Sequence, residues 1–132
     1  FTSLALSDRA EDAVGGIPVR RFPYVYPFLG LSREAREELD RKGGNLVSFS
    51  LLKALLREPG VNLLHAHSGK RLGGIVRTAA RLRGIPYVVT LHGNVFDVPG
   101  EQMEDLTAPS RGKFEWGRAL RPTWPGRQAS KT

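Results

Sequence analysis

The sequence predicts an α/β protein with a doubly wound parallel sheet. A strand, a helix and a second strand follow one another over residues 61–91, and such a unit closes with a right-handed crossover that makes its strands parallel. Residues 86–91 are apolar almost throughout, which is typical of a strand covered on both faces. The chain has 132 residues, of which 40% are hydrophobic, enough for one domain with a core.

The N-terminal part predicts two strands. Residues 2–6 form a short apolar run, and Ile17–Phe22 alternates apolar and polar side chains. Pro18 indicates that the second strand begins there or lies at a sheet edge. The polar residues 7–16, which include two glycines, are expected to form a loop.

Two helices are expected next. Ser32 is a suitable N-cap for a helix over residues 33–42, which are rich in Glu, Arg and Ala. A Gly-Gly pair ends this helix, and Asn45 can cap the following one. The second helix has an apolar face, and the dipeptide 59–60, Pro-Gly, ends it.

The βαβ unit has clear boundaries. Residues 61–65 are expected to be its first strand, and residues 70–83 its helix, with one apolar stripe. Gly84 is the expected C-terminal stop, and residues 86–91 form the second strand. Beyond it, residues 101–121 are expected to be helical with a break near Pro109.

The positive charge is concentrated at the C-terminal end. Residues 1–110 carry fourteen basic and twelve acidic side chains, a net of +2, whereas residues 111–132 carry six basic and one acidic, a net of +5. A basic tail on a nearly neutral body does not indicate a nucleic-acid partner. We therefore expect one domain over residues 1–120 and an unstructured basic tail over 121–132.

The chain has three histidines, and the predicted topology brings all of them to one place. His65 and His67 close the first strand of the βαβ unit, and His92 closes the second. The carboxyl ends of parallel strands share one edge of the sheet, where open α/β sheets bind ligands. Ser68 and Gly69 precede a helix N-terminus, which favours an anion such as phosphate. The small neighbours that complete this edge are Gly93 and Asn94.

A zinc site and cysteine chemistry are two other possibilities for this edge. Three imidazoles and a water are a catalytic zinc arrangement, but His67 is expected to lie past the end of its strand, where side chains no longer alternate. A chain without cysteine has neither a thiol nucleophile nor a disulfide framework. We therefore expect no metal site, with a three-histidine zinc hydrolase as an alternative.

Two stretches carry a family resemblance. They are residues 60–74, Gly-Val-Asn-Leu-Leu-His-Ala-His-Ser-Gly-Lys-Arg-Leu-Gly-Gly, and residues 83–93, Arg-Gly-Ile-Pro-Tyr-Val-Val-Thr-Leu-His-Gly. This pattern resembles the N-terminal, acceptor-side domain of family 4 glycosyltransferases. The resemblance covers about residues 1–120 and implies a Rossmann-like domain, half of a GT-B architecture.

The resemblance also implies a function. Such enzymes transfer a sugar from a nucleotide-sugar donor to a sugar or lipid-linked acceptor, with retention at the anomeric carbon and without a metal or other cofactor. The histidine matching His92 would lie at the reacting centre. His65, His67, Ser68 and Gly69 match the loop that faces the acceptor. Arg71 could meet a phosphate or an anionic acceptor, and Gly93 and Asn94 belong to the same expected binding edge.

The chain departs from the family pattern at both ends. Family members open with a strand, a glycine-rich loop and a helix before the part that matches Phe1, and continue into a second lobe that holds most donor contacts. We therefore expect a fragment truncated at both ends, with an unpaired sheet edge and no activity alone.

An alternative to the enzyme is a non-catalytic α/β module that binds a sugar or nucleotide. No stretch approaches the roughly 20 apolar residues that a spanning helix needs, so we expect no transmembrane segment and a cytoplasmic location.

Overall fold

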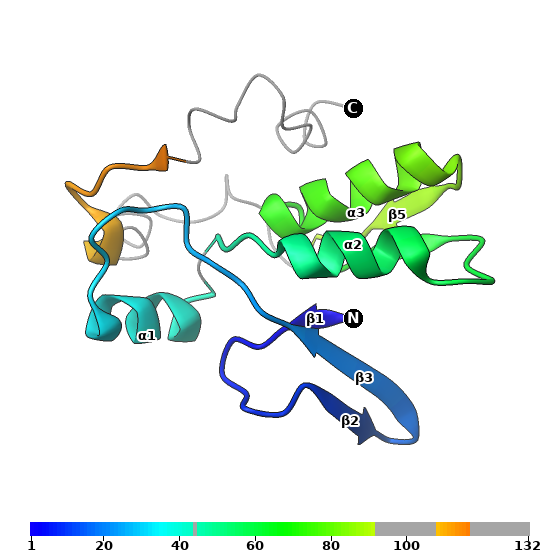
Figure 1. Ribbon diagram of the computed structural model, residues 1–132, viewed down its shortest axis with the longest axis horizontal. Helices are drawn as coiled ribbons and strands as arrows, with labels where there is room; N and C mark the ends of the chain where they lie inside the picture. Colours follow the sequence, from blue (N-terminus) through cyan, green and yellow to red (C-terminus); the bar gives the residue numbers. More distant parts are fainter. Residues whose placement is uncertain (44, 92–107, 117–132) are drawn as a thin grey trace.

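The computed structural model describes residues 1–43, 45–91 and 108–116, which form an α/β arrangement of short strands and three α-helices (Figure 1). The elements, in chain order, are β1 (Thr2–Ser3), β2 (Glu11–Val14), β3 (Ile17–Phe22), α1 (Arg33–Arg41), α2 (Phe49–Arg57), β4 (Leu64–Ala66), α3 (Arg71–Arg83), β5 (Tyr87–Val89) and the 3-10 turn η2 (Ala108–Ser110). The described strands form two sheets, one of three strands and one of two.

The first sheet has the strand order β1-β3-β2. β1 runs parallel to β3, whereas β2 and β3 form an antiparallel hairpin. The expectation that residues 7–16 form a loop was therefore wrong, because they contain β2. Gly15 and Gly16 both adopt positive φ, +58° and +79°, and this pair makes the tight turn of a two-residue hairpin. The two glycines were the signal for a hairpin, not for an open loop.

Pro18 lies inside β3, in a place that does not need its missing N–H. Arg21 N donates to the carbonyl of Ala10 at 2.7 Å, so the odd-numbered residues of β3 face β2 and the nitrogen of Pro18 faces the other side. β1 pairs only with Arg21 and Phe22 and does not reach Pro18. The proline therefore occupies a local sheet edge, as expected.

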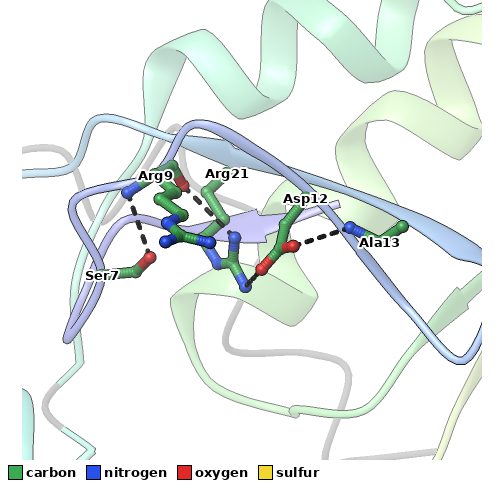
Figure 2. A network of polar contacts seen from close by, with 5 residues as sticks. All are labelled: Ser7, Arg9, Asp12, Ala13 and Arg21. Carbon is green, nitrogen blue, oxygen red and sulfur yellow. Dashed lines mark hydrogen bonds and ion pairs between the residues drawn. The ribbon is translucent and has the colours of Figure 1, made fainter.

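Polar contacts tie the segment before β2 to the hairpin, as Figure 2 shows. The guanidinium of Arg21 donates to the carbonyl of Arg9 and lies 3.3 Å from a carboxylate oxygen of Asp12. The Ser7 hydroxyl accepts from the backbone N–H of Arg9, and Asp12 accepts from the N–H of Ala13. Arg21 thus joins strands that carry few buried apolar side chains of their own.

The helix α1 begins and ends close to expectation. The Ser32 hydroxyl accepts from the N–H of Ala35 at 3.2 Å, which confirms Ser32 as the N-cap. Near the other end of the helix, Asp40 accepts hydrogen bonds from two tyrosine hydroxyls, Tyr24 at 2.5 Å and Tyr26 at 2.8 Å. The aromatic loop is thereby fastened to α1, and Tyr26 is buried there with Leu39.

The helix α2 starts later than expected, because the residues before it are extended. Val47 and Val25 form an antiparallel bridge with two backbone hydrogen bonds of 2.8 Å. The N-cap is Ser48, whose hydroxyl accepts from Leu51 N and donates to the carbonyl of Pro23. Asn45 therefore does not cap α2, and the expected cap was wrong.

The βαβ unit is present and its strands are parallel, as expected. β4 pairs with β5 in the register Leu64↔Tyr87 and Ala66↔Val89. The helices α2 and α3 lie side by side over one face of this pair (Figure 1). Ile75 of α3 is fully buried in the main core. Gly84 ends α3 in the left-handed conformation, as expected.

The described residues cover one face of this strand pair. Within the described ranges, only one face of β4 and β5 is covered: Leu64 and Ala66 are buried, whereas Val88 on the opposite face is 48% exposed. Residues 86–91 therefore include apolar side chains that the described helices do not bury, such as Val88. A run such as 86–91 does not by itself distinguish a strand covered on one face from a strand covered on two.

Among the described strands, β1 and β4 each have a partner on one side only. Leu64 N donates to Pro86 O and Thr90 N donates to Ala66 O, so the intervening His65 turns its backbone groups away from β5. By the same alternation, Ser3 turns its backbone groups away from β3.

Three expectations fall wholly or partly outside the described residues. These are the helix over 101–121, of which only η2 and residues 111–116 are described, the domain boundary at residue 120, and the tail over 121–132. Pro109 lies inside the 3-10 turn η2. In the part of the chain that is described, no helix has the length and apolar character required to cross a bilayer.

Candidate functional site

The loops that follow β4 and β5 meet, as the βαβ topology predicts. The N–H of Thr90 donates to the carbonyl of Ala66 at 2.8 Å, which continues the ladder one step past β5. A Cβ placed on Gly69 would lie 2.7 Å from the end of the Leu91 side chain, so the two loops lie close together here. Residues more than twenty positions apart therefore share the carboxyl edge of this sheet.

At this edge the two described histidines pack against each other. The rings of His65 and His67 have centroids 4.2 Å apart and planes inclined by 34°. Both side chains are exposed, on the face of β4 that the described helices do not cover. The Nε2 atom of His65 lies 2.7 Å from the Oγ1 atom of Thr90, a hydrogen bond in which either atom can donate.

His65 lies inside β4 and not at its end, because β4 runs from Leu64 to Ala66, whereas the expected strand ended at residue 65. His67 follows the last residue of β4, as expected. Residues two apart in a strand share a face, and the register extends Ala66↔Val89 to His67 opposite Thr90. The two histidines and Thr90 are therefore brought together by strand geometry alone.

The helix α3 approaches the loop after β4 very closely. A Cβ placed on Gly73 would lie only 2.1 Å from the carbonyl oxygen of Ser68. No side chain fits there, so Gly73 is required for the contact between the first turn of α3 and the loop. Ser68 and Gly69 are thereby held in front of the N-terminal end of α3, where anions are favoured.

The N-terminus of α3 is capped by a residue distant in sequence. Lys70 makes no side-chain cap; instead, the side-chain oxygen of Asn45 accepts from the N–H of Arg71 at 3.0 Å. The Arg71 guanidinium donates to the carbonyl of Asn45 at 2.6 Å and forms an ion pair with Glu115. Arg71 is thus engaged in joining α3 to the loop before α2 and to the segment 108–116.

A cavity of about 460 Å³ adjoins the histidine pair. Its walls are apolar side chains of α2 and α3, together with Phe1 and β4, and its polar lining includes His65, His67 and Ser68. The edge strands β1 and β4 both contribute residues to its lining, Thr2 from β1 and Leu64–Ala66 from β4. Its volume is within the range of small-molecule sites.

A second, smaller cavity of about 170 Å³ lies on the other side of Ser68 and Leu72, which line both. Tyr26, Asp40 and Lys70 contribute to its wall. Asp40 already accepts from two tyrosines there. Of the two residues that line both cavities, Ser68 is the polar one.

Comparison with protein families matched residues 2–129 to the family described as Glycosyl transferase 4-like domain. The chain belongs to this family. The match confirms the resemblance on which residues 60–74 and 83–93 were interpreted, and it extends past the expected limit near residue 120. Comparison with curated proteins and with solved structures gave no match.

The glycosyltransferase 4-like domain brings together four of the residues predicted for its site. His65, His67, Ser68 and Gly69 lie at one edge of the β4–β5 pair. Arg71 is near them, but its contacts run to Asn45 and Glu115. The remaining predicted site residues, His92, Gly93 and Asn94, lie outside the described residues, and His92 follows directly on Leu91.

Sequence reasoning missed two residues of the site. Thr90 was treated only as part of a strand, although counting from His67 across a parallel register would have placed it next to the histidines. Asn45 was assigned to the wrong helix, and nothing local in the sequence indicates that its side chain caps α3. Among the described residues, no three His, Cys, Asp or Glu side chains are grouped as metal ligands.

Proposed function

We propose that this domain is the acceptor side of a glycosyltransferase that moves a sugar from a nucleotide sugar to a sugar or lipid-linked acceptor. The family match over residues 2–129 carries this proposal. In the reaction, the bond from the anomeric carbon to the nucleotide phosphate breaks, and a bond to an acceptor hydroxyl oxygen forms with retention. The hydroxyl proton leaves with the nucleoside diphosphate or to solvent, and no metal ion is required.

The position of the histidines supports the proposal. His65, His67 and Ser68 border the larger cavity at the carboxyl edge of a parallel strand pair, where open α/β sheets bind ligands. Imidazole and hydroxyl groups can both donate and accept hydrogen bonds, which suits them to acceptor hydroxyls.

His92 is proposed to act at the reacting centre. It follows β5 by three residues, next to Leu91, whose side chain contacts the loop at Gly69. An imidazole there would donate a hydrogen bond to charge that develops on the donor phosphate or to a sugar hydroxyl. We further propose that the domain is one half of a GT-B architecture with a doubly wound sheet, and that a second lobe supplies most donor contacts.

The test is a turnover assay of the enzyme in which this domain is joined to a donor-binding lobe. His92→Ala should lower kcat by roughly two to four orders of magnitude, because a hydrogen bond made mainly in the transition state is lost. His65→Ala and His67→Ala are the matched controls, and they should act mainly on the KM of the acceptor. The 132-residue chain alone should not turn over a sugar nucleotide, because reactants must be held between two lobes.

Near-normal turnover of His92→Ala would show that His92 is structural. If all three substitutions abolished activity equally and the wild type held one equivalent of zinc, a metal mechanism would replace the one proposed. Activity that persists in a metal chelator supports the metal-independent reaction.

A further inference from the structure

Thr90 is placed by the backbone and not by its side chain. Its N–H donates to the carbonyl of Ala66 at 2.8 Å, so the residue is fixed to β4 by the hydrogen-bond ladder. Its side chain is half-buried, and its hydroxyl oxygen lies 2.7 Å from Nε2 of His65. The backbone therefore holds the Thr90 hydroxyl in place beside the exposed ring of His65.

The His65 ring needs a contact of this kind to keep one orientation. It stands on the face of β4 that no described helix covers, and an exposed side chain there would exchange among rotamers. Two contacts restrain it, namely the hydrogen bond to the Thr90 hydroxyl and the packing of the His67 ring, at 4.2 Å between centroids. The three side chains lie together on this face, and one of them belongs to a residue held by the sheet.

We propose that Thr90 is a positioning residue for the histidine pair: its hydroxyl fixes the ring of His65, and that ring supports His67, which contacts the acceptor. The last step rests on the proposed function, whereas the first two concern the chain without ligand. His65 and His67, which the sequence pattern treats alike, thus have different roles.

The positions of the two histidines along the chain give the reason for this division. His65 lies inside β4, where its Nε2 atom bonds to Thr90, and its ring is placed there as a support. His67 lies beyond the last residue of β4, next to Ser68, at the end of the strand where ligands of α/β sheets bind. His65, the supporting ring, is thus followed toward the edge by His67, the ring that contacts the acceptor.

The first test compares Thr90→Val with Thr90→Ser in the 132-residue chain, without ligand. Valine has nearly the shape of threonine and keeps the backbone N–H that bonds to Ala66, but it lacks the hydroxyl, whereas serine retains it. Nuclear Overhauser contacts of the imidazole protons report which side chains lie beside each ring. The chain has three histidines, so His65→Ala and His67→Ala assign the signals.

In the wild type we expect nuclear Overhauser contacts between the His65 and His67 rings and between the His65 ring and Thr90. Thr90→Val should abolish the contacts between the two rings while the backbone signals of β4 and β5 stay in place, and Thr90→Ser should restore them. A Thr90→Val spectrum identical to that of the wild type would overturn the proposal, because the hydroxyl would then position nothing.

The second test uses the transfer assay of the two-lobed enzyme. Thr90→Val should raise the acceptor KM by about tenfold, the effect of one hydrogen bond, with kcat changed much less, and Thr90→Ser should restore it. Altered rings with an unchanged acceptor KM would refute the role of His67 as the contact. If the enzyme transferred no sugar at all, the proposed function would fail, while the spectra would still decide whether Thr90 positions the pair.

Discussion

Gly73 shows how one residue determines the shape of the candidate site. The first turn of α3 can approach the loop after β4 only because position 73 has no side chain, since a Cβ would lie 2.1 Å from the Ser68 carbonyl oxygen. That contact holds Ser68 between the two cavities. A glycine inside a helix normally weakens it, so its presence at this position is explained by packing.

We therefore predict that Gly73→Ala destabilises the domain. In a helix interior without such a contact, the change would stabilise by up to about 1 kcal/mol. Here the Ser68 backbone must move, and overpacking of this kind costs about 1–3 kcal/mol. Urea unfolding of the two proteins measures the difference. A gain in stability would contradict the close approach of α3 to the loop.

Single residues also show where sequence reasoning succeeds. Ser32 and Gly84 act through neighbours one to four positions away, and both were predicted in their roles as helix caps. Asn45 and Thr90 act on Arg71 and His65, each more than twenty positions distant. Their partners are set by how the elements pack, so local pattern could not find them.

At the scale of elements, α1 is held to the aromatic loop by one carboxylate. Asp40 accepts from the hydroxyls of Tyr24 and Tyr26. Burial first, and then the hydrogen bond and charge of Asp40, raise the pKa of Tyr24 from 10.0 to about 12. The same causes raise the pKa of Tyr26. Both phenols therefore stay protonated in the folded protein at a pH where free tyrosine ionises.

This arrangement predicts a loss of stability in alkali. Below pH 10 both phenols are neutral in the folded and unfolded states, so their contribution is complete. Above it the unfolded chain releases protons that the folded protein retains, and stability falls as the pH rises toward about 12. Urea unfolding between about pH 9 and pH 11 should show this fall, and the Tyr24→Phe/Tyr26→Phe double variant should lose part of it.

Tyr87→Phe is the matched control, because it removes the hydroxyl of the third tyrosine, which lies in the other core cluster. That variant should keep the alkaline fall. An equal pH dependence in the double variant and the wild type would show that Asp40 does not hold the two phenols.

The elements also differ in how far the sequence predicts them. The helices α1 and α3 were expected at nearly their observed places, because apolar periodicity and caps act within each segment. The two strands of the βαβ unit were expected in the right order but are shorter than predicted. β2 was missed because its side chains are polar, and it is a strand through its pairing with β3. α2 was expected too early, because the Val25–Val47 bridge keeps the residues before it extended.

For the molecule as a whole, the two sheets and the space between them are the main feature. The edge strands β1 and β4 both contribute residues to the larger cavity, and an unpaired edge can pair with another chain. The family resemblance leads us to expect such an edge, but it says nothing of a place next to the histidines. That position follows from the packing of α2 and α3 on β4.

We predict that the 132-residue chain associates as its concentration rises, and that its edge amides are poorly protected. In hydrogen exchange, the amides of Ser3 and His65 should exchange faster than those of Leu64 and Thr90, which donate to β5 and β4 carbonyls. Sedimentation velocity over a concentration series measures the association. A monodisperse monomer with one sharp, cooperative melt and slow exchange at all four amides would contradict the open edges.

We propose that the carboxyl edge of the β4–β5 pair is the sugar-binding side of this glycosyltransferase 4-like domain. A titration of the ¹⁵N-labelled chain with monosaccharides, disaccharides and nucleotide sugars, followed by amide chemical shifts, tests this directly. We expect shifts confined to residues 65–73 and 90–94, and we expect His67→Ala to weaken them while the distant hairpin of β2 and β3 stays unchanged. Shifts centred on that hairpin, or none at the edge with any of these sugars, would contradict it.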